Sequence, residues 1–129
     1  MATIFTRIIQ GEVPCHKVGE DDRYLAFLDI NPLREGHTLV IPKVEVDYLF
    51  DHHDDLLSGI LPFAKTVARR IKAVVPCARI GLTVIGLEVP HAHIHLIPID
   101  GMRDMEFSRA KLTMSHEAFA ALAERIREA

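Results

Sequence analysis

His91-Ala92-His93-Ile94-His95-Leu96-Ile97-Pro98 places a histidine at every second position and then continues with apolar residues to a proline. Successive side chains of a β-strand point to opposite faces, so an extended segment would put all three imidazoles on one face and Ala92, Ile94 and Leu96 on the other. At about 3.3 Å per residue, the outer two rings would stand roughly 13 Å apart with His93 midway. The pattern predicts a strand with one reactive face and one core face.

The chemistry of the reactive face follows from the ordinary pKa of imidazole, which is about 6.5. At pH 7 a neutral ring can act as a nucleophile, and a protonated neighbour can stabilise an oxyanion. The length of the row suits a phosphate-bearing ligand, with His93 as the reacting centre. The alternative is a zinc-dependent hydrolase, in which two histidines of the strand are ligands and His37, His52 or Glu88 supplies a third.

Length and composition favour one domain over residues 1–129, because 49% of the residues are hydrophobic and no linker is evident. The alternation of short extended runs with helical ones predicts that this domain is of the mixed α+β class. The formal charge of -3 argues against a nucleic-acid polymer as partner, since such proteins normally carry a basic excess. The start of the chain lacks a signal-peptide pattern, and no run approaches the roughly 18 apolar residues of a membrane span. We therefore expect a cytoplasmic protein without a membrane partner.

The rest of the chain alternates short extended runs with helical ones. Apolar positions at helical spacing across residues 51–75 predict a long amphipathic helix, in which Pro62 should cause either a kink or a break. Gly86 predicts a bend before the histidine strand, which should end near residue 99. The other predicted elements are a helical turn at residues 5–9, strands at 17–20, 24–28, 36–42 and 79–85, and a helix from Ser115 to residue 128.

Several motifs besides the histidines occur in a recognisable order. They are Ile-Ile-Gln-Gly-Glu-Val-Pro at residues 8–14, Glu-Asp-Asp at 20–22, Leu-Ala-Phe-Leu-Asp-Ile-Asn-Pro at 25–32 and Gly-His-Thr-Leu-Val-Ile-Pro-Lys at 36–43. Together with the histidines, they resemble the histidine triad (HIT) family of nucleotide hydrolases and transferases, most closely its bacterial Hint-like members. The resemblance covers residues 4–99. It implies a single HIT domain with an antiparallel sheet of about five strands, one long central helix, a short N-terminal helix and a C-terminal helix.

The resemblance also implies a reaction at the α-phosphate of nucleoside phosphoramidates or dinucleoside polyphosphates. His93 would attack the phosphorus, and the nucleotidyl-histidine so formed would then be hydrolysed by water. His95 and His37 match family positions near the phosphate, and His91 would support their geometry. This chemistry requires neither a metal nor another cofactor.

A purine nucleotide or nucleotide conjugate is the ligand that the resemblance implies. Asp29 matches the carboxylate that binds the ribose hydroxyls, and Ile8, Phe27 and Ile30 match the apolar base pocket. Glu88 stands where some relatives place a serine that serves the leaving group. The family resemblance further implies a homodimer in which the two sheets join into one.

Departures from the family pattern leave two matters open. Relatives that carry zinc have Cys-x-x-Cys near the N-terminus, where this chain has Thr3 and Thr6, and Glu45 stands where they often place a histidine. In an ungapped alignment, Ile80 and Leu87 replace an asparagine and a glutamine that hold the phosphate and the bridging atom. The alternative of a nucleotide-binding module with weak or no hydrolysis therefore remains, and the sequence does not identify the leaving group.

Overall fold

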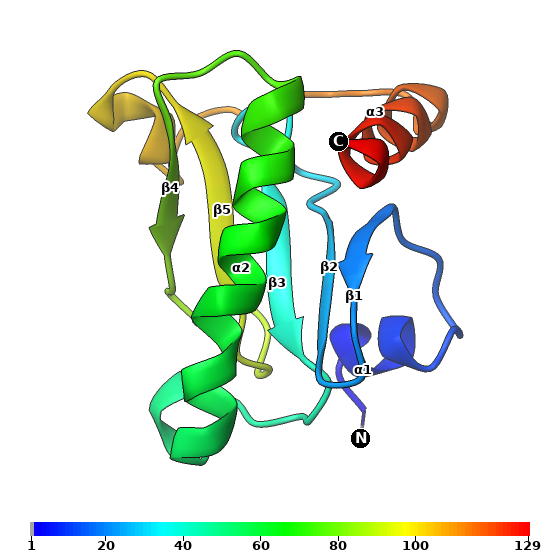
Figure 1. Ribbon diagram of the computed structural model, residues 1–129, viewed down its shortest axis with the longest axis vertical. Coiled ribbons are helices and arrows are strands. Elements are labelled where there is room, and N and C mark those ends of the chain that lie inside the picture. The colour runs from blue at the N-terminus through cyan, green and yellow to red at the C-terminus, as the bar shows by residue number, and fades with distance from the viewer. Residues whose placement is uncertain (1) are drawn as a thin grey trace.

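The computed structural model describes residues 2–129 and has a five-stranded antiparallel sheet at its centre (Figure 1), with strand order β1-β2-β3-β5-β4. The strands are β1 Lys17–Glu20, β2 Tyr24–Leu28, β3 Thr38–Pro42, β4 Arg79–Thr83 and β5 Ile94–Ile99. The helices are α1 Ile4–Ile9, α2 Asp54–Val74 and α3 His116–Glu128, with 3-10 turns at Leu49–Asp51 and Met102–Met105. The predicted α+β architecture, with one long helix and two terminal helices, is confirmed.

Helix α2 covers one face of the sheet, and α3 packs beside it near β1 (Figure 1). The residues that α2 buries recur at helical spacing, as the amphipathic pattern predicts, and Ser115 caps α3 by accepting the Ala118 N–H. Every second residue of the strands points toward the helices, and those residues, including Val40, Ile94 and Leu96, complete this main core. A smaller cluster on the opposite face comprises Phe5, Leu25, Phe27, Leu39 and Ile41.

Pro62 lies inside α2 without dividing it, because the helix is continuous from Asp54 to Val74. The predicted alternative of two helical segments is wrong. The missing N–H of Pro62 costs one bond to the carbonyl of Ser58, and that residue is exposed, so water can satisfy the carbonyl. None of the helices between residues 2 and 129 has the length and apolar character needed to span a bilayer.

The histidine segment departs from the predicted strand. Strand β5 begins only at Ile94, so His91 and His93 precede it, and only His95 lies in the ladder. The Ala92 N–H bonds to the Val46 carbonyl, which belongs to the loop after β3 and not to a strand. Gly86 has a φ of 76° and produces the predicted bend before this segment.

Candidate active site

The sheet face opposite α2 carries a cleft with two adjoining chambers. The apolar chamber, about 290 Å³ in volume, includes Phe5, Ile8, Phe27, Ile30, Leu39 and Val89 in its lining. The Lys111 chamber, about 240 Å³, includes His37, Ile85, Leu87, Phe107 and Lys111. Asp29, Asn31, Glu88, His93 and His95 line both chambers. Every predicted site residue except His91 therefore borders the cleft.

His93 lies at the junction of the two chambers, and a backbone group sets its tautomer. Its Nδ1 is 2.8 Å from the carbonyl oxygen of His91, which can only accept, so Nδ1 carries the proton. The lone pair of the neutral ring is therefore on Nε2. Ring contacts with Phe5 and His95, at centroid distances of 5.1 and 5.0 Å, hold the imidazole in place. This arrangement gives His93 a nucleophilic nitrogen in the cleft.

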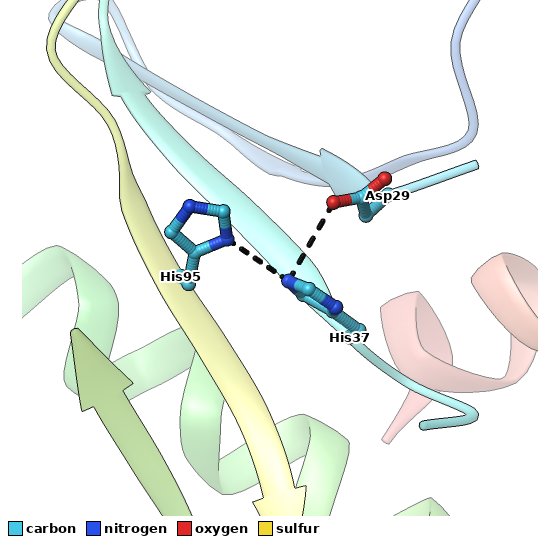
Figure 2. Close-up of side chains that lie close together, drawn as sticks. All are labelled: Asp29, His37 and His95. Carbon is cyan, nitrogen blue, oxygen red and sulfur yellow. Dashed lines mark hydrogen bonds and ion pairs between the residues drawn. The ribbon is translucent and has the colours of Figure 1, made fainter. Parts of the chain in front are cut away.

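His37 and His95 form a second chain whose tautomers are also set by the backbone. The Leu33 N–H donates to Nδ1 of His37 over 3.0 Å, so a neutral His37 carries its proton on Nε2. That nitrogen donates in turn to Nδ1 of His95 over 3.0 Å (Figure 2). The proton of a neutral His95 is therefore on Nε2, where it can be donated to a ligand.

Burial keeps both members of this chain neutral. Desolvation and the neighbouring His95 lower the pKa of His37 to about 3, and desolvation and His93 lower that of His95 to about 4. In the free cleft, His95 is therefore not the protonated neighbour that could stabilise an oxyanion. His95 is instead a neutral hydrogen-bond donor.

His91 is fully buried and lines neither chamber. Its Nε2–H donates to the Pro42 carbonyl over 2.8 Å, and its Nδ1 lies 3.2 Å from the Thr3 hydroxyl. Burial is the main cause that lowers its pKa. Because both ring nitrogens are hydrogen-bonded, the ring of His91 is fixed, and its backbone carbonyl is held toward Nδ1 of His93. His91 therefore orients His93 and does not contact a ligand in the cleft.

Thr3, Thr6 and Glu45, three of the departures from the zinc-bearing pattern, meet beside His91. One carboxylate oxygen of Glu45 accepts the Thr3 N–H at 2.8 Å and the Thr6 hydroxyl at 2.6 Å. These bonds lower the pKa of Glu45. Because the Thr6 hydroxyl donates to Glu45, the Thr3 hydroxyl is left to donate to Nδ1 of His91. Hydroxyls and a carboxylate thus form one network that fixes the ring of His91.

Asp29 stands between the chambers, at the end of β2. Its Oδ1 accepts the Asn31 N–H at 2.8 Å, the turn contact typical of an aspartate, and its Oδ2 lies 3.6 Å from Nε2 of His37 (Figure 2). Burial raises the pKa of this carboxyl, the Asn31 N–H lowers it, and the charge of Glu88 raises it further. The turn contact leaves Oδ2 facing the cleft.

The register of β4 on β5 shows that the ungapped alignment assigned the wrong residue of β4 to the phosphate-binding position. Ile80 pairs with Pro98 and packs against the main core on the α2 face, so it cannot replace a phosphate contact. Thr83 pairs with His95 and therefore lies on the site face. Leu87 and Glu88 are exposed, and both line the Lys111 chamber.

Phe107 and Lys111 are among the residues that line the cleft without having been predicted. They lie in an irregular segment, where no repeating pattern of residues predicts which side chains face the cleft. The rings of Phe107 and His95 meet edge to face at a centroid distance of 4.8 Å. Only the folded chain brings them together.

Ligand atoms of Asp29, His37 and His95 lie within 4.8 Å of one another, close enough for a metal ion. The hydrogen bonds oppose that use. A metal-bound imidazole normally donates its second N–H, whereas Nδ1 of His37 accepts one from Leu33. His52, the other histidine considered as a third zinc ligand, is buried, has an Nε2 without a partner among residues 2–129, and lines neither chamber.

Comparison with known proteins identifies the family to which this fold belongs. The model of the HIT domain matches residues 10–102. The chain is 38% identical to an uncharacterised HIT-like protein of Borreliella burgdorferi, with 95% of this chain and 94% of the relative covered. It is 40% identical to the adenosine 5'-monophosphoramidase HNT1 of Saccharomyces cerevisiae, over 75% of this chain and 62% of that protein.

Solved structures give the same result. The crystal structure of a HIT-like protein from Bartonella henselae, described as involved in cell-cycle regulation, has a TM-score of 0.84 and 30% identity, covering 98% of this chain and 94% of its own. The histidine triad nucleotide-binding protein of Candida albicans has a TM-score of 0.69 and 31% identity, covering 98% and 96%. The fold and the buried histidines define an α+β domain of the HIT class. The chain belongs to the HIT domain family.

Proposed function

We propose that the chain is a nucleotide hydrolase that cleaves a nucleoside phosphoramidate or a dinucleoside polyphosphate at the α-phosphate. The apolar chamber would bind a purine base, with Asp29 on the ribose hydroxyls. The observation that carries the proposal is the bond from Nδ1 of His93 to the His91 carbonyl, which leaves a nucleophilic Nε2 at the junction of the chambers. The activity named for HNT1, that of an adenosine 5'-monophosphoramidase, supports the same reaction class.

The proposed reaction has two steps. Nε2 of His93 forms a bond to phosphorus while the bond to the leaving group breaks, and a nitrogen leaving group departs with a proton from water. The ring becomes positively charged, and the His91 carbonyl stabilises this charge through Nδ1–H. Nε2–H of His95 donates to a phosphate oxygen, where charge develops. Water then displaces His93 from phosphorus and releases the nucleoside monophosphate.

The decisive experiment is to mix the protein with adenosine 5'-monophosphoramidate, quench with base, and search for one added nucleotide on the His93 peptide by mass spectrometry. His93→Ala should abolish both adduct and turnover while it still binds AMP by calorimetry. His53→Ala is the matched control, because that histidine is exposed and lines neither chamber. Turnover by His93→Ala at the wild-type rate would contradict the proposal.

A nucleotide-binding module is the competing function, and the same experiment separates the two. AMP binding by the wild-type protein, with no turnover of phosphoramidates or dinucleoside polyphosphates, would favour it. The structure weakens one reason for this alternative, because Ile80 lies on the α2 face of the sheet, away from the cleft, and so does not replace a phosphate-binding residue.

We also propose that the protein is a homodimer joined along β4. This strand forms one edge of the sheet, and Leu82 on it is 46% exposed beside the 58% exposed Leu61 of α2. Both line a shallow groove with Ile80 and Ala64. An unpaired edge next to an apolar patch favours pairing with another chain.

A further inference from the structure

The segment that follows β5 forms one wall of the Lys111 chamber. Phe107 and Lys111 belong to this segment, and both lie beyond residue 102, where the match to the HIT domain ends. The wall is therefore contributed by a part of the chain outside the matched range. Residues of this wall can distinguish the ligands of this protein from those of other members.

Several contacts fix the segment against the rest of the molecule. Asp104 pairs with Arg34 at 2.8 Å and accepts the Asp100 N–H at 2.7 Å. The Leu112 N–H donates to the Pro32 carbonyl at 2.8 Å. Together with the Phe107 ring on His95, these contacts hold both ends of the wall in place.

The ammonium of Lys111 has one donor to spare. An ammonium carries three N–H groups, and Lys111 donates to the carbonyls of Phe107 and Arg109. Its charge also reaches the site: after burial and His95, it is a further cause of the lowered pKa of His37, and it partly opposes the burial that raises the pKa of Asp29. Among the chamber residues within 2–129, Lys111 is the only lysine or arginine.

The other charges of the chamber limit what Lys111 can bind. Asp29 and Glu88 line the same space, so a free anion would meet two carboxylates there. An anionic group delivered on a nucleotide is different, because the apolar chamber would fix its position. Ile85, Leu87 and Phe107 offer apolar contact for the carbon atoms that precede such a group.

We propose that the Lys111 chamber binds the leaving group and that Lys111 selects leaving groups that carry an anionic oxygen group, either a carboxylate or a phosphate. The assignment rests on the proposed hydrolase function, in which His93 acts at the junction of the chambers. Lys111 is then a specificity-determining residue for that reaction.

Two pairs of AMP phosphoramidates test the assignment. One pair carries glycine or glycinamide as the amine, and the other carries 2-aminoethyl phosphate or ethanolamine, so each pair differs only in the anionic group. For the wild-type protein, the ratio of kcat/KM for the acidic over the neutral member should be about tenfold in one of the pairs. The pair that shows this preference identifies the anionic group as a carboxylate or a phosphate.

Variants assign the preference to Lys111. Lys111→Gln should bring the ratio toward one, and Lys111→Arg should retain it. Lys72→Gln, at an exposed lysine of α2 far from the cleft in sequence and outside both chambers, should leave it unchanged. An equal loss on both members of a pair, or turnover without acid preference in either pair, would overturn the role of Lys111. Absence of wild-type turnover both of these phosphoramidates and of a dinucleoside polyphosphate would instead refute the hydrolase function itself.

Discussion

At the scale of single residues, backbone groups decide which nitrogen of each histidine is available. The His91 carbonyl accepts from Nδ1 of His93, which leaves the lone pair on Nε2. The Leu33 N–H donates to His37, and His37 donates to Nδ1 of His95, which leaves the proton of His95 on Nε2. Two neutral imidazoles thus have different roles: His93 is the nucleophile and His95 is the hydrogen-bond donor. The Glu45 network extends this control to residues that never border the cleft.

Glu45 therefore provides a test of positioning from outside the cleft. Glu45→Ala removes the acceptor of Thr3 and Thr6, frees the ring of His91 and loosens the carbonyl that orients His93. We expect kcat to fall about three- to tenfold with little change in KM, because a small misplacement of the nucleophile slows the chemistry. Glu45→Gln keeps an amide oxygen in place and should retain most of the activity.

Steady-state kinetics on the two Glu45 variants, with thermal unfolding as a check of folding, measures this effect. Glu12→Ala is the matched control, because Glu12 is exposed and lines neither chamber. Equal kcat values for Glu45→Ala and the wild-type protein would show that His93 needs no support from the network.

The buried neutral histidines also make a prediction for stability against pH. His37 has a pKa near 3 in the folded protein, and an unfolded histidine has one near 6.5, so between these values the unfolded chain binds more protons. The free energy of unfolding should therefore increase as pH rises through this window and level off above 6.5. For one histidine the slope is at most about 1.4 kcal/mol per pH unit.

Urea unfolding of the wild-type protein and of His37→Gln, at intervals from pH 5 to pH 7.5, measures this slope. The variant should show a smaller dependence on pH, because one buried neutral imidazole is gone. His53→Gln, at an exposed position, should keep the slope of the wild-type protein. A stability that decreased from pH 5 to pH 6.5 would contradict the sign.

At the scale of elements, regular patterns could be predicted from the sequence and local exceptions could not. The spacing of apolar residues located α2, and the cap at Ser115 located α3. Alternation of His91, His93 and His95 wrongly predicted one strand, because the period of two shows which side chains share a face but not whether a neighbouring strand pairs with them. Of the kink or break predicted at Pro62, the break does not occur, since tertiary packing of α2 outweighs the loss of one solvated hydrogen bond.

The site residues that belong to the sequence motifs could be predicted, and those outside the motifs could not. The cleft where the resemblance expects a ligand is bordered by Asp29, Phe27, Glu88 and all the predicted histidines except His91. Phe107 and Lys111 were missed because an irregular segment reaches the cleft only through contacts such as Arg34 to Asp104. The network of Glu45 was visible in the sequence only as a departure from a zinc-binding pattern.

At the scale of the whole molecule, the sheet separates stability from chemistry. Helices α2 and α3 cover one side of the sheet (Figure 1), and the main core lies between them and the strands. The cleft occupies the opposite face of the sheet. The N-terminal helix α1 lines the apolar chamber of that cleft, and the segment after β5 lines the Lys111 chamber. Substitutions on the α2 face can therefore test the proposed dimer without entering the site.

The proposed dimer can be tested on that α2 face. In a dimer joined along β4, Leu61 of α2 would be buried next to Leu82, so Leu61→Lys would place a charge in an apolar contact and weaken association more than about tenfold. Sedimentation velocity across the micromolar range should give a dimer for the wild-type protein and a monomer for the variant. Val44→Lys is the matched control, because Val44 is 57% exposed and lies in the loop after β3, so this variant should remain dimeric. A wild-type protein that sediments as a monomer throughout would rule out a stable β4 interface and leave the apolar groove without a second copy to cover it.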